Sequence, residues 1–368
     1  MKKKVMVIFG TRPEAIKMCP LVNQLKKKPD YFETIVCVTG QHEEMLLQVL
    51  KAFNLKPDYN LHIMKANQTL FDININVLEG IRTIYEKEKP DLVLVHGDTS
   101  TTYASALAAY YMKIDVAHIE AGLRTYNIYS PFPEEFNRQA VGLISRFHFS
   151  PTKQAKDNLL KEGKKESSIF VTGNTVIDAL QTTKDIIDGG EYDDWIGESK
   201  LILLTCHRRE NLGQPMKNIF QAIKRIVENF KDIKIIYPIH KNPLIHELID
   251  TYLIGHNRIK VVPPLDVLEF HHLLKKSYFV MTDSGGIQEE APALGKPVLV
   301  LRDTTERPEG VEAGTLRLCG TNENAIYESA HMLLTNRIEY EKMSKANNPY
   351  GDGNACERIV DALINELF

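Results

Sequence analysis

A glycine pair followed by two glutamates stands in the segment TDSGGIQEE, directly after an apolar run. Ser284, Gly285 and Gly286 can present bare backbone N–H groups at the start of a helix, which is a common phosphate site. The carboxylate of Glu290 cannot bind phosphate, but it can accept hydrogen bonds from neutral vicinal hydroxyls such as those of a ribose. The combination indicates a nucleoside diphosphate that is held at both ends. A capped helix with an acidic first turn is the alternative, more for Glu289 than for Glu290.

Three carboxylates in the first half of the chain could serve as acids or bases. Asp98 (in HGDTSTT) and Glu120 (in EAGLRT) follow successive apolar runs, and Glu134 (in PEEFNR) opens another helix. Each has a simpler explanation alone, because Asp98 could be an N-cap and first-turn glutamates favour the helix dipole. Like charges that converge on one site repel each other, so the set as a whole indicates acid–base chemistry.

Cationic groups also follow apolar runs. Arg12 lies in GTRPEAIK, where a cation at a helix N-terminus is unfavourable unless an anion sits beside it. His207, Arg208 and Arg209 lie together in CHRRENLG, which a basic surface loop would also explain. The segment GTRPEAIK is not GxGxxG, so the chain lacks a dinucleotide fingerprint.

Short apolar runs alternate with amphipathic stretches and must position these groups. Predicted strands span residues 5–9, 34–39, 91–95, 116–119, 147–149, 169–171, 201–205, 234–237, 259–262, 278–281 and 297–301. Apolar strands that alternate with helices predict parallel sheets covered on both faces, and ligands bind beyond the carboxyl ends of such strands. The rhythm breaks before residue 200, so we expect two doubly wound α/β domains, residues 1–172 and 173–351, that face each other across a cleft.

Composition excludes several classes of protein. The 368 residues carry a net charge of −3, which gives no support for a nucleic-acid partner or an anionic membrane surface. No apolar run approaches the ~20 residues of a membrane span, and the lysine-rich start lacks the apolar region of a signal peptide. Five scattered cysteines predict reduced thiols in a cytoplasmic protein. The twelve histidines show no metal-ligand spacing.

The motifs together resemble those of the non-hydrolysing UDP-N-acetylglucosamine 2-epimerases. The matching segments, in the same order and over essentially the whole chain, are GTRPEAIK, HGDTSTT, EAGLRT, PEEFNR, HRRENLG, TDSGGIQEEAPALGKPVLVLRDTTERPEG and NPYGDGNA. The resemblance implies a GT-B-like fold of two Rossmann-like domains, with a C-terminal helix (residues 352–368) packed back on the first. It also implies a cytoplasmic homodimer that interconverts UDP-N-acetylglucosamine and UDP-N-acetylmannosamine with no cofactor, neither NAD nor metal.

The resemblance also assigns roles to individual residues. Asp98, Glu120 and Glu134 form the acid–base set, without a decision on which removes the proton, and His207 stabilises the departing diphosphate. The positions that hold UDP or the sugar are Arg12, Lys17, Phe270, Ser284, Gly285, Gly286, Glu290 and Arg307.

A second substrate molecule activates members of this family, and the positions that match its site are Gln41, Glu44, Asn67, Arg208 and His240. Glu44 and Asn67 depart from the Gln and Arg that the family pattern predicts, so weak activation is expected. A hydrolysing epimerase and a GT-B glycosyltransferase are the alternative functions.

Overall fold

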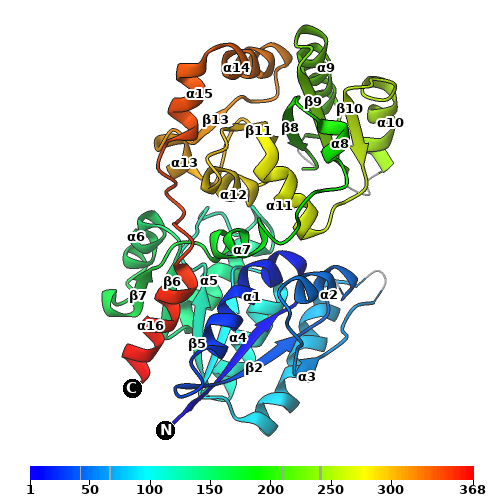
Figure 1. The fold of residues 1–368 in the computed structure, drawn as a ribbon. Helices are drawn as coiled ribbons and strands as arrows, with labels where there is room; N and C mark the ends of the chain where they lie inside the picture. The colour runs from blue at the N-terminus through cyan, green and yellow to red at the C-terminus, as the bar shows by residue number, and fades with distance from the viewer. Residues whose placement is uncertain (42, 66–67, 209–210, 240–242) are drawn as a thin grey trace. The chain divides into compact units, whose positions relative to one another are not determined.

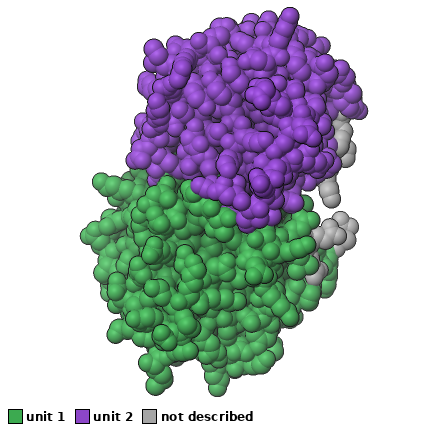
Figure 2. Space-filling view, viewed as in Figure 1, with its two compact units in different colours: residues 1–182, 350–368 green, residues 183–349 purple. Residues whose placement is uncertain are grey.

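The computed structural model describes residues 1–41, 43–65, 68–208, 211–239 and 243–368, with no side chains described at 43–44 and 243–246. The chain divides into two compact units (Figure 2). Unit 1 comprises Met1–Thr182 and Tyr350–Phe368, and unit 2 comprises Thr183–Pro349. These units describe compactness and not independent folding, so the domain boundary predicted from the sequence, between residues 172 and 173, stays a prediction.

Unit 1 contains a seven-stranded parallel sheet with strand order β3-β2-β1-β4-β5-β6-β7. Figure 1 shows this unit, with α1, α4, β2 and β5 among its labelled elements. The strands are β1 (Lys3–Phe9), β2 (Phe32–Val38), β3 (Tyr59–Asn60), β4 (Leu92–His96), β5 (Asp115–Ile119), β6 (Phe147–Ser150) and β7 (Ile169–Val171). The helices are α1 (Arg12–Lys26), α2 (Glu43–Ala52), α3 (Leu70–Glu88), α4 (Ser100–Tyr111), α5 (Glu134–Ile144), α6 (Lys153–Lys161), the short 3-10 helix η1 (Glu166–Ser168), α7 (Thr175–Thr183) and α16 (Ala355–Leu367). The strand order reverses direction at β1 and β4, which is the switch point where doubly wound sheets bind ligands.

Unit 2 contains a six-stranded parallel sheet with strand order β10-β9-β8-β11-β12-β13. Its strands are β8 (Lys200–Thr205), β9 (Ile233–Pro238), β10 (Ile259–Val262), β11 (Ser277–Thr282), β12 (Val298–Val300) and β13 (Leu316–Leu318). Its helices are α8 (Asp193–Ile196), α9 (Gln214–Asn229), α10 (Pro243–Tyr252), α11 (Val267–Lys276), α12 (Ile287–Ala293), α13 (Pro308–Glu312), α14 (Glu323–Thr335) and α15 (Arg337–Ser344). The α/β class and the two parallel Rossmann-like sheets of a GT-B-like fold are confirmed.

The central strands are apolar throughout because helices cover both faces of each sheet. In β1 the side chains from Val5 to Phe9 are fully buried, as are those from Leu92 to Val95 in β4. The two strands absent from the sequence prediction, β3 and β13, are short and lie at the sheet edges. The apolar strand interiors leave the polar motifs at the strand ends, where the loops begin.

The C-terminal helix α16 belongs to unit 1, where it packs against α1. Its N-terminus is capped from another helix, because Asp178 of α7 accepts hydrogen bonds from the backbone N–H groups of Ala355 (3.2 Å) and Cys356 (2.8 Å). Backbone N–H groups at a helix start have no partner within the helix, so this buried carboxylate fixes the returning segment. Among the described helices, none is both long and apolar enough to span a membrane.

Candidate active site

Glu120 is held by several donors at the end of β5. Lys17 Nζ lies 2.7 Å from both carboxylate oxygens, and Asn174 Nδ2 donates to one of them at 3.2 Å. His96 Nε2 lies 2.9 Å from Glu120 Oε2. Burial opposes ionisation, but Lys17 and His96 outweigh it and hold the pKa of Glu120 well below its usual range. Glu120 is therefore an anion at neutral pH.

The backbone at Glu120 is also unusual. Its φ of 63° lies in the left-handed region, which residues other than glycine seldom adopt. Gly97, with a φ of 67°, stands at the end of the neighbouring β4, and a Cβ placed there would lie 3.6 Å from Glu120 Oε2. That distance is an ordinary van der Waals contact, so the left-handed backbone and not a lack of space favours glycine at position 97. Strained backbone of this kind is concentrated at functional sites.

Asp98 stands in a different electrostatic environment from Glu120. Its Oδ2 accepts a hydrogen bond from Arg138 Nε at 2.9 Å, and 31% of the side chain is exposed. Although partly accessible, the carboxylate is enclosed by protein on most sides, and this burial raises its pKa. Arg138 opposes the rise, whereas the charges of Glu120 and Glu134 add to it. The N-cap of α4 is Thr99, so the N-cap alternative for Asp98 is wrong.

The two glutamates at the start of α5 differ in their surroundings. Glu134 is half-buried and acts on the ionisation of Asp98. Glu135 is fully buried and accepts hydrogen bonds from the backbone N–H groups of Thr125 and Tyr126, each at 3.0 Å. Arg138 Nη1 also donates to Glu135 at 3.2 Å, so this arginine joins the loop support to Asp98. Glu135 therefore holds the loop, and the acid–base role of Glu134 stays a prediction.

A buried carboxylate also fixes the loop that carries Arg12. Glu14 accepts hydrogen bonds on one oxygen from the N–H groups of Gly10 (3.0 Å) and Thr11 (2.7 Å). Its other oxygen accepts from the hydroxyl of Thr99 at 2.6 Å. Because Thr99 follows Asp98, Glu14 ties the Arg12 loop to the Asp98 loop.

Asp283 organises the loop after β8 in unit 2. Its fully buried Oδ2 accepts hydrogen bonds from the backbone N–H groups of His207 and Arg208, both at 2.9 Å, and from Asn211 Nδ2 at 3.0 Å. Its Oδ1 lies 3.6 Å from His207 Nδ1. The backbone of His207 is therefore held by Asp283, while 42% of its side chain is exposed.

The glycine loop of unit 2 is closely covered by charged side chains. A Cβ on Gly285 would lie 2.8 Å from Glu306 Oε1 and 3.2 Å from the guanidinium carbon of Arg307. A larger residue at position 285 would therefore have to displace the end of the Glu306 side chain. Ser284 donates its N–H to Thr282 Oγ1 at 2.9 Å, and its carbonyl accepts from Gln288 at 3.1 Å, so the loop is also held from within.

Three arginines surround the Glu306 carboxylate. Arg208 Nη2 lies at 3.0 Å, Arg302 Nη1 at 2.6 Å and Arg307 Nη1 at 3.3 Å. Burial opposes ionisation of Glu306, but the three guanidinium groups lower its pKa to about 2. Arg307 also binds the buried Glu289, with both contacts at 2.7 Å. Glu289 therefore orients an arginine. It stands in the first turn of α12, as the alternative of an acidic first turn predicted.

Glu290 and Phe270 stand near one histidine. Glu290 Oε2 lies 3.5 Å from His271 Nε2 with 12% of the side chain exposed. The ring centroid of Phe270 lies 6.2 Å from that of His271. In the described parts of the chain, no three His, Cys, Asp or Glu side chains form a group that could hold a metal ion.

The residues assigned to an activator site are only partly visible. Gln41 Oε1 accepts a hydrogen bond from Thr101 Oγ1 at 3.3 Å. Arg208 lies with Glu306, as described above. Asn67, His240 and the side chain of Glu44 lie outside the described residues.

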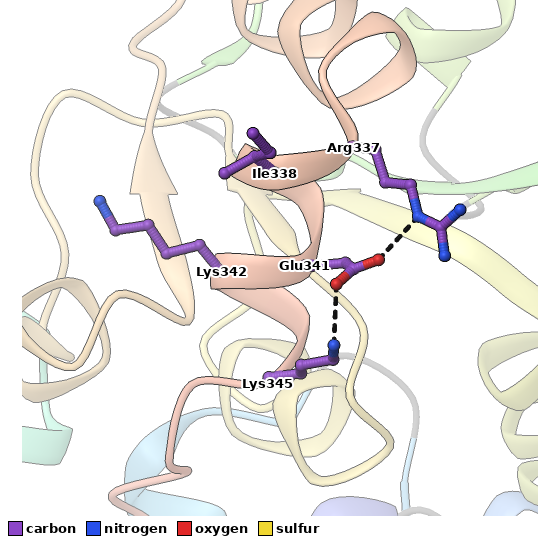
Figure 3. A pocket seen from close by; sticks show the side chains of 5 residues that line it. All are labelled: Arg337, Ile338, Glu341, Lys342 and Lys345. Atoms are coloured by element: carbon purple, nitrogen blue, oxygen red, sulfur yellow. Dashed lines mark hydrogen bonds and ion pairs between the residues drawn. The ribbon is translucent and has the colours of Figure 1, made fainter.

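A hollow of about 460 Å³ lies along α15 and contains none of the predicted site residues. Figure 3 shows Arg337 and Lys345 directed toward Glu341, at 2.7 and 2.8 Å. These are exposed ion pairs one helical turn apart, which are typical of a solvated helix face. We therefore place the candidate site at the strand ends.

The fold is that of a GT-B-like α/β protein, with Glu120 held by Lys17 at a strand end of unit 1 and three arginines around Glu306 in unit 2. Residues 23–364 match the family model for UDP-N-acetylglucosamine 2-epimerase. The chain belongs to that family.

Individual relatives are similar over nearly their full length. The UDP-N-acetylglucosamine 2-epimerase of Bacillus subtilis is 60% identical over 99% of this chain and 95% of its own. A crystal structure of a putative UDP-N-acetylglucosamine 2-epimerase from Listeria monocytogenes has a TM-score of 0.94 at 54% identity, covering 100% of this chain and 97% of that one. The UDP-GlcNAc 2-epimerase of Neisseria meningitidis, solved with UDP-GlcNAc bound, has a TM-score of 0.91 at 47% identity, covering 98% and 100%.

Sequence reasoning did not single out the residues that support the site. These are Glu14, His96, Arg138, Asn174, Asp283, Glu289 and Glu306, each in contact with a predicted residue or its loop. His96 and Asp283 stand at the carboxyl ends of β4 and β11. Since ligands bind beyond the carboxyl ends of such strands, this position could have identified both residues from the sequence. Arg138 and Asn174 lie in or before helices and carried no such signal.

Proposed function

We propose that this protein interconverts UDP-N-acetylglucosamine and UDP-N-acetylmannosamine without hydrolysis. The observation that carries the proposal is the opposite environment of two neighbouring carboxyl groups, because burial raises the pKa of Asp98 whereas Lys17 and His96 hold that of Glu120 well below its usual range. Pairs of titratable groups whose environments separate their pKa values are typical of acid–base partners. Family membership supplies the substrate class.

The chemistry explains why two such groups are needed. The hydrogen on C2 of the sugar is not acidic, because no carbonyl is adjacent in the ring. Elimination solves this, since C2 loses a proton while the C1–O bond breaks and the electron pair leaves with UDP, giving 2-acetamidoglucal. UDP then adds back at C1 while a proton is delivered to the opposite face of C2. In one direction Glu120 accepts the first proton and Asp98 delivers the second, and the roles exchange in reverse.

Unit 2 would hold the departing UDP in this mechanism. The arginines beside Gly285 would carry positive charge toward a diphosphate, whereas the N–H group of Ser284 is already donated to Thr282. The exposed part of the His207 side chain is suited to stabilise the leaving oxygen. These are roles that the resemblance assigns and that the local geometry supports.

Incubation with UDP-N-acetylglucosamine alone in D2O tests the function. Deuterium is expected at C2 of both epimers without accumulation of free UDP, because the proton returned to C2 comes from a carboxyl group that has exchanged with the solvent. Stoichiometric release of free N-acetylmannosamine and UDP would instead identify a hydrolysing epimerase. A lack of reaction until a sugar acceptor is added would identify a glycosyltransferase.

Glu290 is proposed to hold the ribose of UDP. Glu290→Gln keeps the shape but removes the charge of the acceptor, a change of about 1.5–3 kcal/mol. UDP affinity should therefore weaken by roughly 10- to 150-fold, since 1.4 kcal/mol corresponds to about one decade. Calorimetry with UDP measures this, and inorganic pyrophosphate, which lacks the ribose, is the control that should bind unchanged. Equal UDP affinity in the variant would remove this role.

We also propose that the protein is a homodimer built on unit 1. Exposed apolar side chains lie on α3 (Phe71, 81%, and Ile75, 52%), α4 (Tyr111, 68%) and α5 (Leu143, 75%). These helices pack against one another in the order α3-α4-α5, so the side chains share one helical layer. Exposed apolar side chains on one helical layer are expected at an interaction surface. Light scattering should give about twice the 41.9 kDa chain mass, and Phe71→Glu should return it toward one chain.

Three further aspects rest on the resemblance. A second substrate molecule is proposed to activate the enzyme, with sigmoidal kinetics as the measurable sign. The product would enter synthesis of surface polysaccharides that contain N-acetylmannosamine. A cytoplasmic setting suits the five buried cysteines, which are free thiols.

A further inference from the structure

The Glu306 carboxylate stands where an anionic ligand of the glycine loop would be expected. Its Oε1 is the nearest atom to the missing Cβ of Gly285, at 2.8 Å. Its two oxygens contact Arg208, Arg302 and Arg307. Guanidinium groups bind carboxylate and phosphate with the same planar donor geometry. A protein carboxylate thus uses donors that a phosphate would use.

The two glutamates of this cluster, Glu289 and Glu306, differ in burial and in the element that carries them. Glu289 belongs to α12, is 2% exposed and pairs with Arg307. Moving its side chain outward would break a buried ion pair, which is costly. The side chain of Glu306 is 29% exposed and lies on the loop between β12 and α13. Three arginines against these two glutamates leave one net positive charge. If Glu306 turns outward, the local charge facing the loop rises to two.

We propose that Glu306 is an affinity-determining residue that competes with the diphosphate of the bound nucleotide for these three arginines. The proposal rests on the assignment of the glycine loop to UDP. In the free protein Glu306 neutralises the arginines and keeps them in place. When the nucleotide binds, its phosphates take over these contacts, and the carboxylate gives way. Because a competing internal anion lowers the affinity for the nucleotide, the nucleotide sugar is released after turnover instead of remaining bound.

An alternative role would change the sign of the effect. If Glu306 only orders the arginines for the ligand, its removal should weaken phosphate binding. Competition predicts the reverse, because removal frees donors and takes a negative charge away from the diphosphate. Measured affinity therefore separates the two.

Glu306→Gln in the full chain should bind UDP and inorganic pyrophosphate about tenfold more tightly, a change equivalent to ~1.4 kcal/mol. Uridine, which has no phosphate, should bind equally to both proteins. Asp303→Asn removes an exposed charge from the same loop, three residues earlier, and should leave UDP affinity within about twofold. Calorimetry at fixed ionic strength measures the affinities for UDP, pyrophosphate and uridine.

Glu306→Ala is the second variant, because it removes the carboxylate and opens the space in front of Gly285. It should also tighten pyrophosphate binding. Unchanged or weaker UDP and pyrophosphate binding in both folded variants would overturn the proposal. If the unmodified protein fails to bind UDP at all, the assignment of the loop to UDP is wrong instead.

Discussion

Replacement of Asp98 by asparagine is expected to lower epimerisation by about 10²–10⁴-fold while leaving the protein as stable as before or more stable. The amide keeps an oxygen for Arg138 but cannot exchange a proton with C2. The stability follows from the raised pKa of Asp98, because a folded-state pKa above the unfolded value means that ionisation is unfavourable in the fold. The contribution of Asp98 to folding stability is favourable at low pH and is lost as the pH rises through the folded-state pKa. Asparagine carries no charge at any pH, so the variant does not incur this loss.

Deuterium exchange at C2 and thermal unfolding at pH 7 check the two halves of this prediction. Asp178→Asn is the matched control, because Asp178 is also a buried carboxyl of unit 1 with a pKa raised by burial. It caps α16 instead of standing at a strand end, so its replacement should lower stability and preserve C2 exchange. Full activity of Asp98→Asn would rule out a catalytic role for this residue.

Replacement of Glu120 by glutamine should abolish activity and also destabilise the protein, by about 3–5 kcal/mol for a broken buried ion pair. Lys17 and His96 would keep their positions but lose their anionic partner. The depressed pKa of Glu120 sets the pH dependence. Its stabilisation is present above the unfolded value of about 4.3 and is lost as pH falls through the still lower folded pKa. The deficit of the variant should therefore be full at pH 7 and shrink in strong acid.

Chemical denaturation at several pH values measures the deficit. The double variant Glu120→Gln with Lys17→Met should recover part of the lost stability, because no unpaired ammonium group remains, and should stay inactive. Additive losses in the double variant would show that Lys17 and Glu120 do not act as a pair. An active Glu120→Gln variant would refute the assignment of Glu120 as proton acceptor.

The two carboxylates thus have opposite expected effects on stability, although the sequence presents them in the same way. Each follows an apolar run and each has a glycine nearby. The partners that separate them come from distant positions, since Lys17 lies 103 residues from Glu120 and Arg138 lies 40 residues from Asp98. No local pattern predicts which cation reaches which carboxylate.

The sequence by itself determined the class of fold, the long central strands and the order of the motifs. Continuous apolar runs such as residues 5–9 predict buried parallel strands because both faces must be covered, and this signal is local. Edge strands β3 and β13, with two and three residues, gain their identity from pairing with β2 and β12, so their own residues carried little signal. Tertiary structure alone decided the ionisation of Asp98 and Glu120, the support of His207 by Asp283 and the position of Glu306 over Gly285. The reason is physical: charge, burial and close approach depend on distances between atoms, and residues far apart in the chain become neighbours only when the sheets form.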